Sequence, residues 1–146
     1  MRNCPPNDIV QPVDRRGVAA TEFALVLPVL LVIVLGTIDL GRAFTTSSAL
    51  ANAVCVGAQE AATHRLTDYT SEVWEQRIRD AVTEELQGTP QVNLGQLTLQ
   101  IDTVAETDGR RRFVVTGGIP FRTVVNWPGI PHVIAMSRSI SIEEYR

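Results

Sequence analysis

The residues best able to do chemistry lie near the N-terminus, where a carboxylate meets an apolar run. Glu22 directly precedes the stretch Phe23 to Gly36, which contains no charged or strongly polar residue, and Arg15, Arg16 and Gly17 lie just before it. An ionisable side chain inside an apolar segment of a membrane is costly and usually has a function with a specific partner. The pattern therefore indicates a carboxylate that pairs with a positive charge. The alternative is a carboxylate that is only tolerated at the membrane edge, protonated or reaching toward water.

Other chemistry is sparse in the sequence. His64 and His132 lack metal-ligand spacing to another His, Cys or acid, whereas a zinc site needs three or four converging ligands. Neither a nucleophile elbow nor a phosphate loop is present. Gly117-Gly118 interrupts an alternating pattern and indicates a β-bulge more than an anion cradle. We therefore expect no catalytic residues, no cofactor site, no metal site and no enzyme activity.

The charge and the positions of the cysteines argue against further classes of function. The net charge of −3 and the 5% aromatic content give no case for nucleic-acid binding. Arg110, Arg111 and Arg112 flank a predicted turn, and they form either a solvated edge or a contact surface for an acidic partner. Cys4 and Cys55 lie on opposite sides of the apolar run. They cannot pair with each other if that run spans a membrane, so we expect Cys55 to be a small buried apolar residue.

The element that must position Glu22 is a helix of membrane-spanning length. Residues 18–38 are apolar apart from the segment's first turn, and about 20 such residues suffice to cross a bilayer. Arginines are in excess before this run, which places the N-terminus in the cytoplasm by the positive-inside rule. We therefore expect three parts: a cytoplasmic leader at 1–17, a transmembrane helix at 18–38 and an extracytoplasmic domain at 39–146.

The sequence pattern after residue 38 predicts an α+β fold for the domain. No proline interrupts 39–65, so the long helix should continue for about 45 residues in all, with an apolar stripe against a core. A break follows at 64–70, and Thr70 or Ser71 can cap a second, short helix that ends at Gly88. The period then changes to two, which predicts a three-stranded antiparallel meander with a turn at Asp108-Gly109. The stripe of the long helix contains Leu50, Ala53, Val54, Gly57 and Ala61, and that of the second helix contains Trp74, Ile78, Ala81, Val82 and Leu86.

The N-terminal motif resembles a known processing site. Gly17-Val18-Ala19-Ala20-Thr21-Glu22-Phe23, after two arginines, resembles the site at which a membrane peptidase cuts type IV prepilins after the glycine. Such a cut would make Val18 the first residue of the mature chain and Glu22 the fifth. Within that superfamily, residues 16–42, which include Pro28 and Gly36-Thr37-Ile38-Asp39-Leu40-Gly41-Arg42, resemble the TadE-like minor pilins (pseudopilins) of tight-adherence (Flp) pili.

The resemblance implies a function in pilus assembly and surface attachment. Its partners would be the inner membrane, the prepilin peptidase, other pilins and the assembly platform, with Gly17 and Val18 at the cleavage site and Glu22 and Phe23 in subunit assembly. The mature chain would stay in the inner membrane, with its domain on the periplasmic side, or enter the pilus. Val18 stands where many type IV pilins have a methylated Phe, and Phe23 stands where the shorter major Flp pilins usually have Tyr.

Two other functions fit the same sequence. One is a signal-anchored periplasmic binding or scaffold protein that is not incorporated in a pilus. The other is a secreted protein with a cleavable signal peptide. Ala51-Asn52-Ala53 offers a small-residue cleavage pattern, but it lies too far beyond the apolar run for a signal peptidase.

Overall fold

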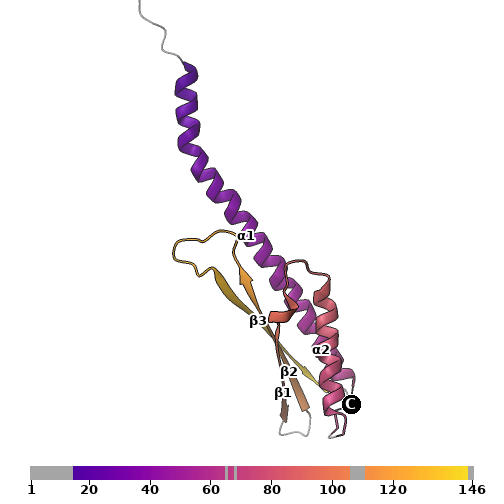
Figure 1. Cartoon of the computed structure of the whole chain (residues 1–146). Helices are drawn as coiled ribbons and strands as arrows, with labels where there is room; N and C mark the ends of the chain where they lie inside the picture. The colour runs from indigo at the N-terminus through magenta and orange to yellow at the C-terminus, as the bar shows by residue number, and fades with distance from the viewer. Residues whose placement is uncertain (1–14, 65, 68, 106–110, 145–146) are drawn as a thin grey trace, which may run out of the picture. The chain divides into compact units, whose positions relative to one another are not determined.

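The computed structural model of the chain describes residues 15–64, 66–67, 69–105 and 111–144. It confirms the α+β prediction: a long N-terminal helix, a second helix and a three-stranded antiparallel sheet (Figure 1). The chain divides into two compact units, Met1–Gly36 and Thr37–Arg146. The elements are α1 (Arg15–Thr63), α2 (Ser71–Gln87), a 3-10 turn η1 (Leu94–Gln96), β1 (Thr98–Ala105), β2 (Arg111–Arg122) and β3 (Val133–Glu143).

Between Phe23 and Gly36, the part of α1 in the first unit is apolar on every side. Large apolar side chains between Val18 and Leu35 are more than a third exposed in each case, and Pro28 lies in the interior of the helix. A helix that is apolar all round needs lipid or other helices about it. Within the described part of the chain, α1 is the one helix long and apolar enough to cross a membrane.

The part of α1 in the second unit has the predicted stripe. Leu50, Ala53, Val54 and Ala61 are buried together with Ala58, and they join Phe113, Val115 and Ile119 of β2 in one core. These helix positions recur at three or four residues and therefore share one face. The stripe covers the sheet face that the strands alone would leave open to water.

Helix α2 packs on the same core through Trp74, Ile78, Val82 and Leu86. The Trp74 ring lies 5.0 Å from that of Phe113, and its indole N–H donates to the carbonyls of Ala61 and His64 at 3.2 and 3.1 Å. A backbone carbonyl that the end of α1 leaves without a helical partner is thus satisfied. Thr70 is the N-cap residue of α2, but its side chain makes no capping hydrogen bond.

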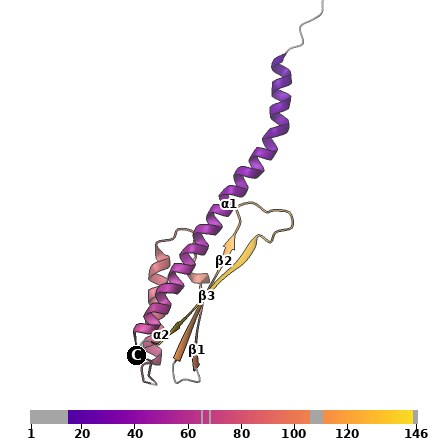
Figure 2. The same ribbon diagram turned by 180° about the vertical axis from the view of Figure 1, so that it is seen from behind.

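The sheet has the order β1-β2-β3 with antiparallel neighbours, as a meander requires. The predicted bulge at Gly117-Gly118 is wrong. Gly117 pairs with Leu99 and Arg138, and Gly118 pairs with Thr98 and Ser137, without an interruption in either ladder. Both views of the ribbon show the connection between β2 and β3 at the end of the sheet beside α1 (Figures 1 and 2). The predicted turn at Asp108-Gly109 and the side chain of Arg110 lie outside the described residues.

Two glycines explain how closely these elements pack. A Cβ on Gly57 of α1 would lie 2.5 Å from Val82 Cγ2 in α2, and a Cβ on Gly117 of β2 would lie 2.6 Å from Val54 Cγ2 in α1. Real Cβ atoms do not come this close to a neighbour. The two missing side chains therefore let α1 approach the sheet on one side and α2 on the other.

This close packing predicts that Gly57 tolerates no side chain, while Gly41 of the same helix does. Gly57→Leu should lower the free energy of unfolding by about 2 kcal/mol or more, because overpacking outweighs the better helix propensity. Gly41→Leu is the matched control, since a Cβ there meets nothing within 4 Å. Denaturant unfolding of the full chain in detergent measures both. Equal stability of the two variants would contradict the packing argument.

Candidate functional site

The residues of the N-terminal motif all lie on α1, because this helix begins at Arg15. Val18 and Glu22 are four residues apart, so they share one face and lie about 6 Å apart along the helix axis. The hydroxyl of Thr21 donates to the Val18 carbonyl at 2.8 Å within this turn. The helix therefore brings Val18 and Glu22 together, whereas Phe23 lies about 100° further around the helix.

Among the described residues, the side chains of this motif pack against no other element. Glu22 is exposed, and Val18 and Phe23 are 49% and 60% exposed. A Cβ at Gly17 would meet nothing within 4 Å, so the fold does not require a glycine at this position. The described part of the chain therefore does not explain the residue types at 17, 18, 22 and 23. Residues 1–14, most of the expected leader, and the side chains of Arg15 and Arg16 lie outside the described residues.

A second carboxylate on α1, Asp39, has a different environment. Its side chain accepts hydrogen bonds from the backbone N–H of Val124 at 2.8 Å and of Val125 at 3.3 Å, and from the indole N–H of Trp127 at 2.9 Å. Arg42, one turn along α1, places a guanidinium nitrogen 3.6 Å from the same carboxylate. Asp39 is only 6% exposed, so these donors replace the water that a carboxylate otherwise binds.

These donors lower the pKa of Asp39. The main cause is the hydrogen bond from the Val124 N–H, followed by that from the Trp127 indole, while desolvation acts in the opposite direction. The Val125 N–H and the charge of Arg42 lower the pKa further. Donors that aim at the ionised form favour it. Asp39 is therefore a charged anchor that holds the loop between β2 and β3 on α1.

Sequence reasoning used Asp39 and Arg42 only as charges that flank the apolar run. The usable signal was an acid at the end of an apolar segment, three residues before an arginine. Its partners lie 85–88 residues away in the chain and donate mostly through the backbone, which carries no sequence signature. Trp127, in a loop rich in Pro and Gly, is a second signal for a contact with Asp39, because a buried indole N–H needs an acceptor.

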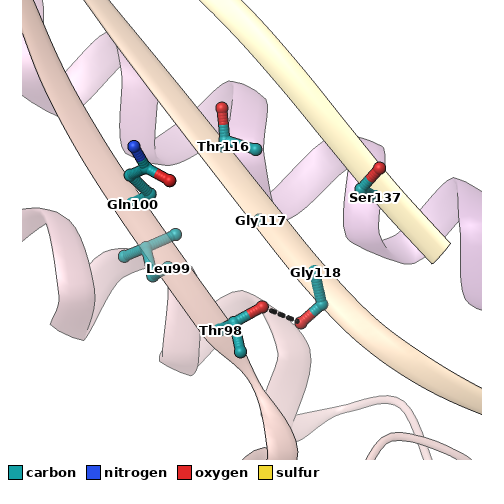
Figure 3. Close-up of a pocket in the computed structure, with 7 residues that line it drawn as sticks. All are labelled: Thr98, Leu99, Gln100, Thr116, Gly117, Gly118 and Ser137. Atoms are coloured by element: carbon teal, nitrogen blue, oxygen red, sulfur yellow. Dashed lines mark hydrogen bonds between the residues drawn. The ribbon is translucent and has the colours of Figure 1, made fainter. Parts of the chain in front are cut away.

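The outer face of the sheet carries a shallow open depression (Figure 3). It forms above Gly118, where the Thr98 side chain fills the position of a Cβ and donates to the Gly118 carbonyl at 3.1 Å. The residues that line it are all uncharged: Thr98, Leu99, Gln100, Thr116, Gly117, Gly118 and Ser137. Such a lining offers hydrogen bonds but no acid, base or nucleophile of unusual reactivity.

The arginines near the predicted turn and Cys55 make contacts within the domain. Arg111 donates to the Leu66 carbonyl at 3.1 Å, and Arg112 lies 3.8 Å from Glu143 on the neighbouring strand. Cys55 is half-buried and its Sγ accepts from Gln59 Nε2 at 3.6 Å, so the expectation of a fully buried Cys55 is wrong. Among the described residues, no three His, Cys, Asp or Glu side chains converge as metal ligands would. The absence of catalysis, cofactor and metal stays a prediction.

The low pKa of Asp39 predicts how acid loosens the loop. A carboxylate with a lowered folded-state pKa contributes stability above its ordinary value of 3.8, and this contribution is lost as the pH falls through the folded-state pKa. Asp39→Asn should remove that part of the acid dependence below about pH 4. It should also speed hydrogen exchange of the Val124 and Val125 amides at neutral pH.

Asp102→Asn, on the outer face of β1, is the matched control for this experiment, because Asp102 contacts the Gln100 side chain and not the loop. Exchange measured by mass spectrometry at pH 7, with unfolding followed from pH 6 to pH 2, checks both expectations. Unchanged loop exchange in Asp39→Asn would show that Asp39 does not anchor the loop.

Comparison with known proteins gives one match. The model of the family described as "TadE-like protein" matches residues 17–59, a range that begins at the glycine of the N-terminal motif and covers most of α1. No curated protein and no solved structure matches the chain. The matched range contains Val18, Glu22 and Phe23 as well as Asp39. Over this range of its long helix, the chain is therefore similar to TadE-like proteins.

Proposed function

We propose that the chain is a minor pilin or pseudopilin of a tight-adherence pilus, made as a membrane-anchored precursor and cut between Gly17 and Val18 by a prepilin peptidase. The observation that carries the proposal is the surface of α1 before Asp39: apolar on every side, with a single carboxylate one turn from Val18. The TadE-like match supports involvement with the Tad pilus machinery. In this proposal, 1–17 is a leader, 18–38 spans the inner membrane and 39–146 lies on the periplasmic side.

The chemistry of the motif follows from cleavage. Cutting after Gly17 leaves a charged α-amine on Val18, beside an apolar helix surface. A charge left unpaired in a dry interface costs roughly 3–5 kcal/mol. Glu22 of a neighbouring subunit can supply the missing anion and so fix the axial register between packed helices. Because Val18 and Glu22 share a helix face, the amine can also meet the carboxylate of its own chain, and an experiment must separate the two cases.

The first test concerns cleavage. Coexpression with the cognate prepilin peptidase should shorten the chain to a product that begins at Val18, and Gly17→Ala should slow this step more than about tenfold, as loss of a few kcal/mol of transition-state binding does. A Cβ at Gly17 meets nothing within 4 Å, so the variant should keep its fold. Gly41→Ala, equally free of contacts, is the control. N-terminal sequencing reads the product directly.

Each outcome of this test separates the alternatives. An uncleaved chain in the presence of active peptidase would favour the signal-anchored periplasmic protein. A product that begins near Cys55 would favour a secreted protein. Equal cleavage of Gly17→Ala and of the parent would show that Gly17 does not mark a prepilin site.

The second test concerns Glu22 and the assembly role. Glu22→Gln should give a stable, processed protein whose crosslinking to other pilin subunits falls sharply, because the Val18 amine then lacks its anion. The side chain is exposed and far from the core around Leu50, so folding should not change. The double variant Glu22→Gln, Val26→Glu keeps one carboxylate on the same face but moves it about 6 Å along the helix, and it should fail as well.

Mixed assembly decides between the two pairings. If the amine pairs between chains, parent subunits should crosslink to each other. A parent subunit should crosslink poorly to a Glu22→Gln neighbour wherever that neighbour would have to supply the carboxylate. If the amine pairs within its own chain, a Glu22→Gln subunit should be defective at its own N-terminus with any neighbour. Full crosslinking and piliation by Glu22→Gln would disprove charge pairing altogether.

A further inference from the structure

Exposed apolar side chains occur on two segments that the Asp39 hydrogen bonds join near the start of the second unit. Leu40 and Phe44 of α1 are 72% and 73% exposed, and Val124 and Ile130 of the β2–β3 loop are 60% and 49% exposed. Val133, the first residue of β3, is also exposed. We call these five residues the border patch. Leu40 and Phe44 are four residues apart and share one helix face.

The anchor at Asp39 fixes the loop beside this part of α1. The Val124 and Val125 N–H groups and the Trp127 indole all donate to the Asp39 carboxylate within 3.3 Å. Trp127 is half-buried, while Ile130 follows it at the tip of the loop. Asp39 comes directly after residues 18–38, the proposed span. If that span crosses a bilayer, the loop must lie at the level where the hydrocarbon ends, because its tether is one residue from that end.

The charges at this end suit an anionic surface. Arg122 at the end of β2 is exposed, and Arg42 of α1 holds its guanidinium carbon 5.6 Å from the centre of the Phe121 ring. Asp39, which pairs with Arg42, already accepts hydrogen bonds from three N–H donors of the loop. The sequence from Pro120 to Ile142 contains arginine and histidine but no Asp or Glu. Phosphate groups of lipids would therefore meet no opposing negative charge here.

We propose that the border patch and Trp127 rest in the headgroup region of the membrane, so that the domain contacts the bilayer through the β2–β3 loop as well as through α1. This inference rests on the proposed function, in that α1 spans a bilayer. An indole with a polar N–H is typical of the boundary between lipid and water, as are arginines with apolar neighbours. Apolar side chains of such a contact are buried about 5–10 Å into the headgroup boundary.

The alternative occupant of the border patch is a second copy of the chain. Lipid is favoured because the helical part of the patch continues the apolar surface of α1 along the sequence: Ile38, the last residue of the proposed span, is exposed, and Leu40 follows it two residues later. The anchor at Asp39 also keeps the loop at this level in a single chain, without a neighbour.

Trp127 provides the test, because the only other tryptophan is Trp74 in the core. The full chain is reconstituted in vesicles of phosphatidylethanolamine and phosphatidylglycerol that contain lipids brominated either near the headgroup or near the chain end. The Trp127→Phe variant gives the signal of Trp74, so the difference from the parent isolates Trp127. We expect quenching of Trp127 by the shallow bromines, weaker quenching by the deep ones, and loss of quenching by aqueous iodide.

Matched variants identify the patch itself. Val124→Ser with Ile130→Ser should restore iodide quenching of Trp127 and reduce quenching by the shallow bromines. Val73→Ser, which changes an equally exposed valine on α2, should do neither. Full iodide quenching of Trp127 in the parent, without quenching by bromolipids, would overturn the inference. Protection from iodide that grows with protein density, again without bromolipid quenching, would assign the patch to a second copy and overturn the lipid contact.

A separate measurement distinguishes failure of the inference from failure of the proposed function. A cysteine at Leu31, in a Cys4→Ser, Cys55→Ser background, should resist water-soluble maleimide if α1 spans the bilayer. Resistance of this cysteine together with a water-exposed Trp127 would overturn the lipid contact alone. Rapid labelling would show that residues 18–38 do not span the membrane, and both proposals would fall together.

Discussion

The carboxylate of Asp39 receives three N–H donors from one loop, at the residue where α1 changes its surroundings. Before Asp39 the helix is apolar on every side; after it, one stripe faces a core and the remainder faces water. The hydrogen bonds at Asp39 attach the loop between β2 and β3 to α1 close to the start of the second unit.

The second constraint is the distance between the backbones of α1, α2 and the sheet. The domain has only about a hundred residues, and a core of this size is modest. Its helix stripe consists largely of alanines, with Ala53, Ala58 and Ala61 fully buried, so there is little side-chain volume to fill a wide gap. Gly57 and Gly117 remove that gap by letting the backbones approach. The alanines and Gly57 of α1 thus act together with Gly117 of β2, because small residues let the elements pack closely without large side chains.

Local patterns were sufficient for most of the fold. The apolar run, the change of period after Pro90 and the alternation in three strands depend on neighbouring residues, and they predicted the helices and the meander that the structure has. Gly117-Gly118 misled the interpretation because a glycine pair in a strand is typical of a bulge, and only the position of Val54 and Leu50 shows that the glycine makes room for a helix. The partners of Asp39 were beyond prediction for a similar reason, since two of them are backbone groups more than 80 residues away.

The two carboxylates at the ends of the apolar run show what such groups require. Asp39 is nearly inaccessible to water and has its donors within its own chain, which lower its pKa. Glu22 is exposed, and its side chain meets no partner in the described part of the chain. If the helix surface around Glu22 were covered by lipid or by other helices, the carboxylate would need a cation, and the described residues place none beside it. A new α-amine at Val18 is the nearest group of that charge that processing could create. Glu22 therefore fits a contact that forms after cleavage, whereas Asp39 already makes its contacts in the single chain.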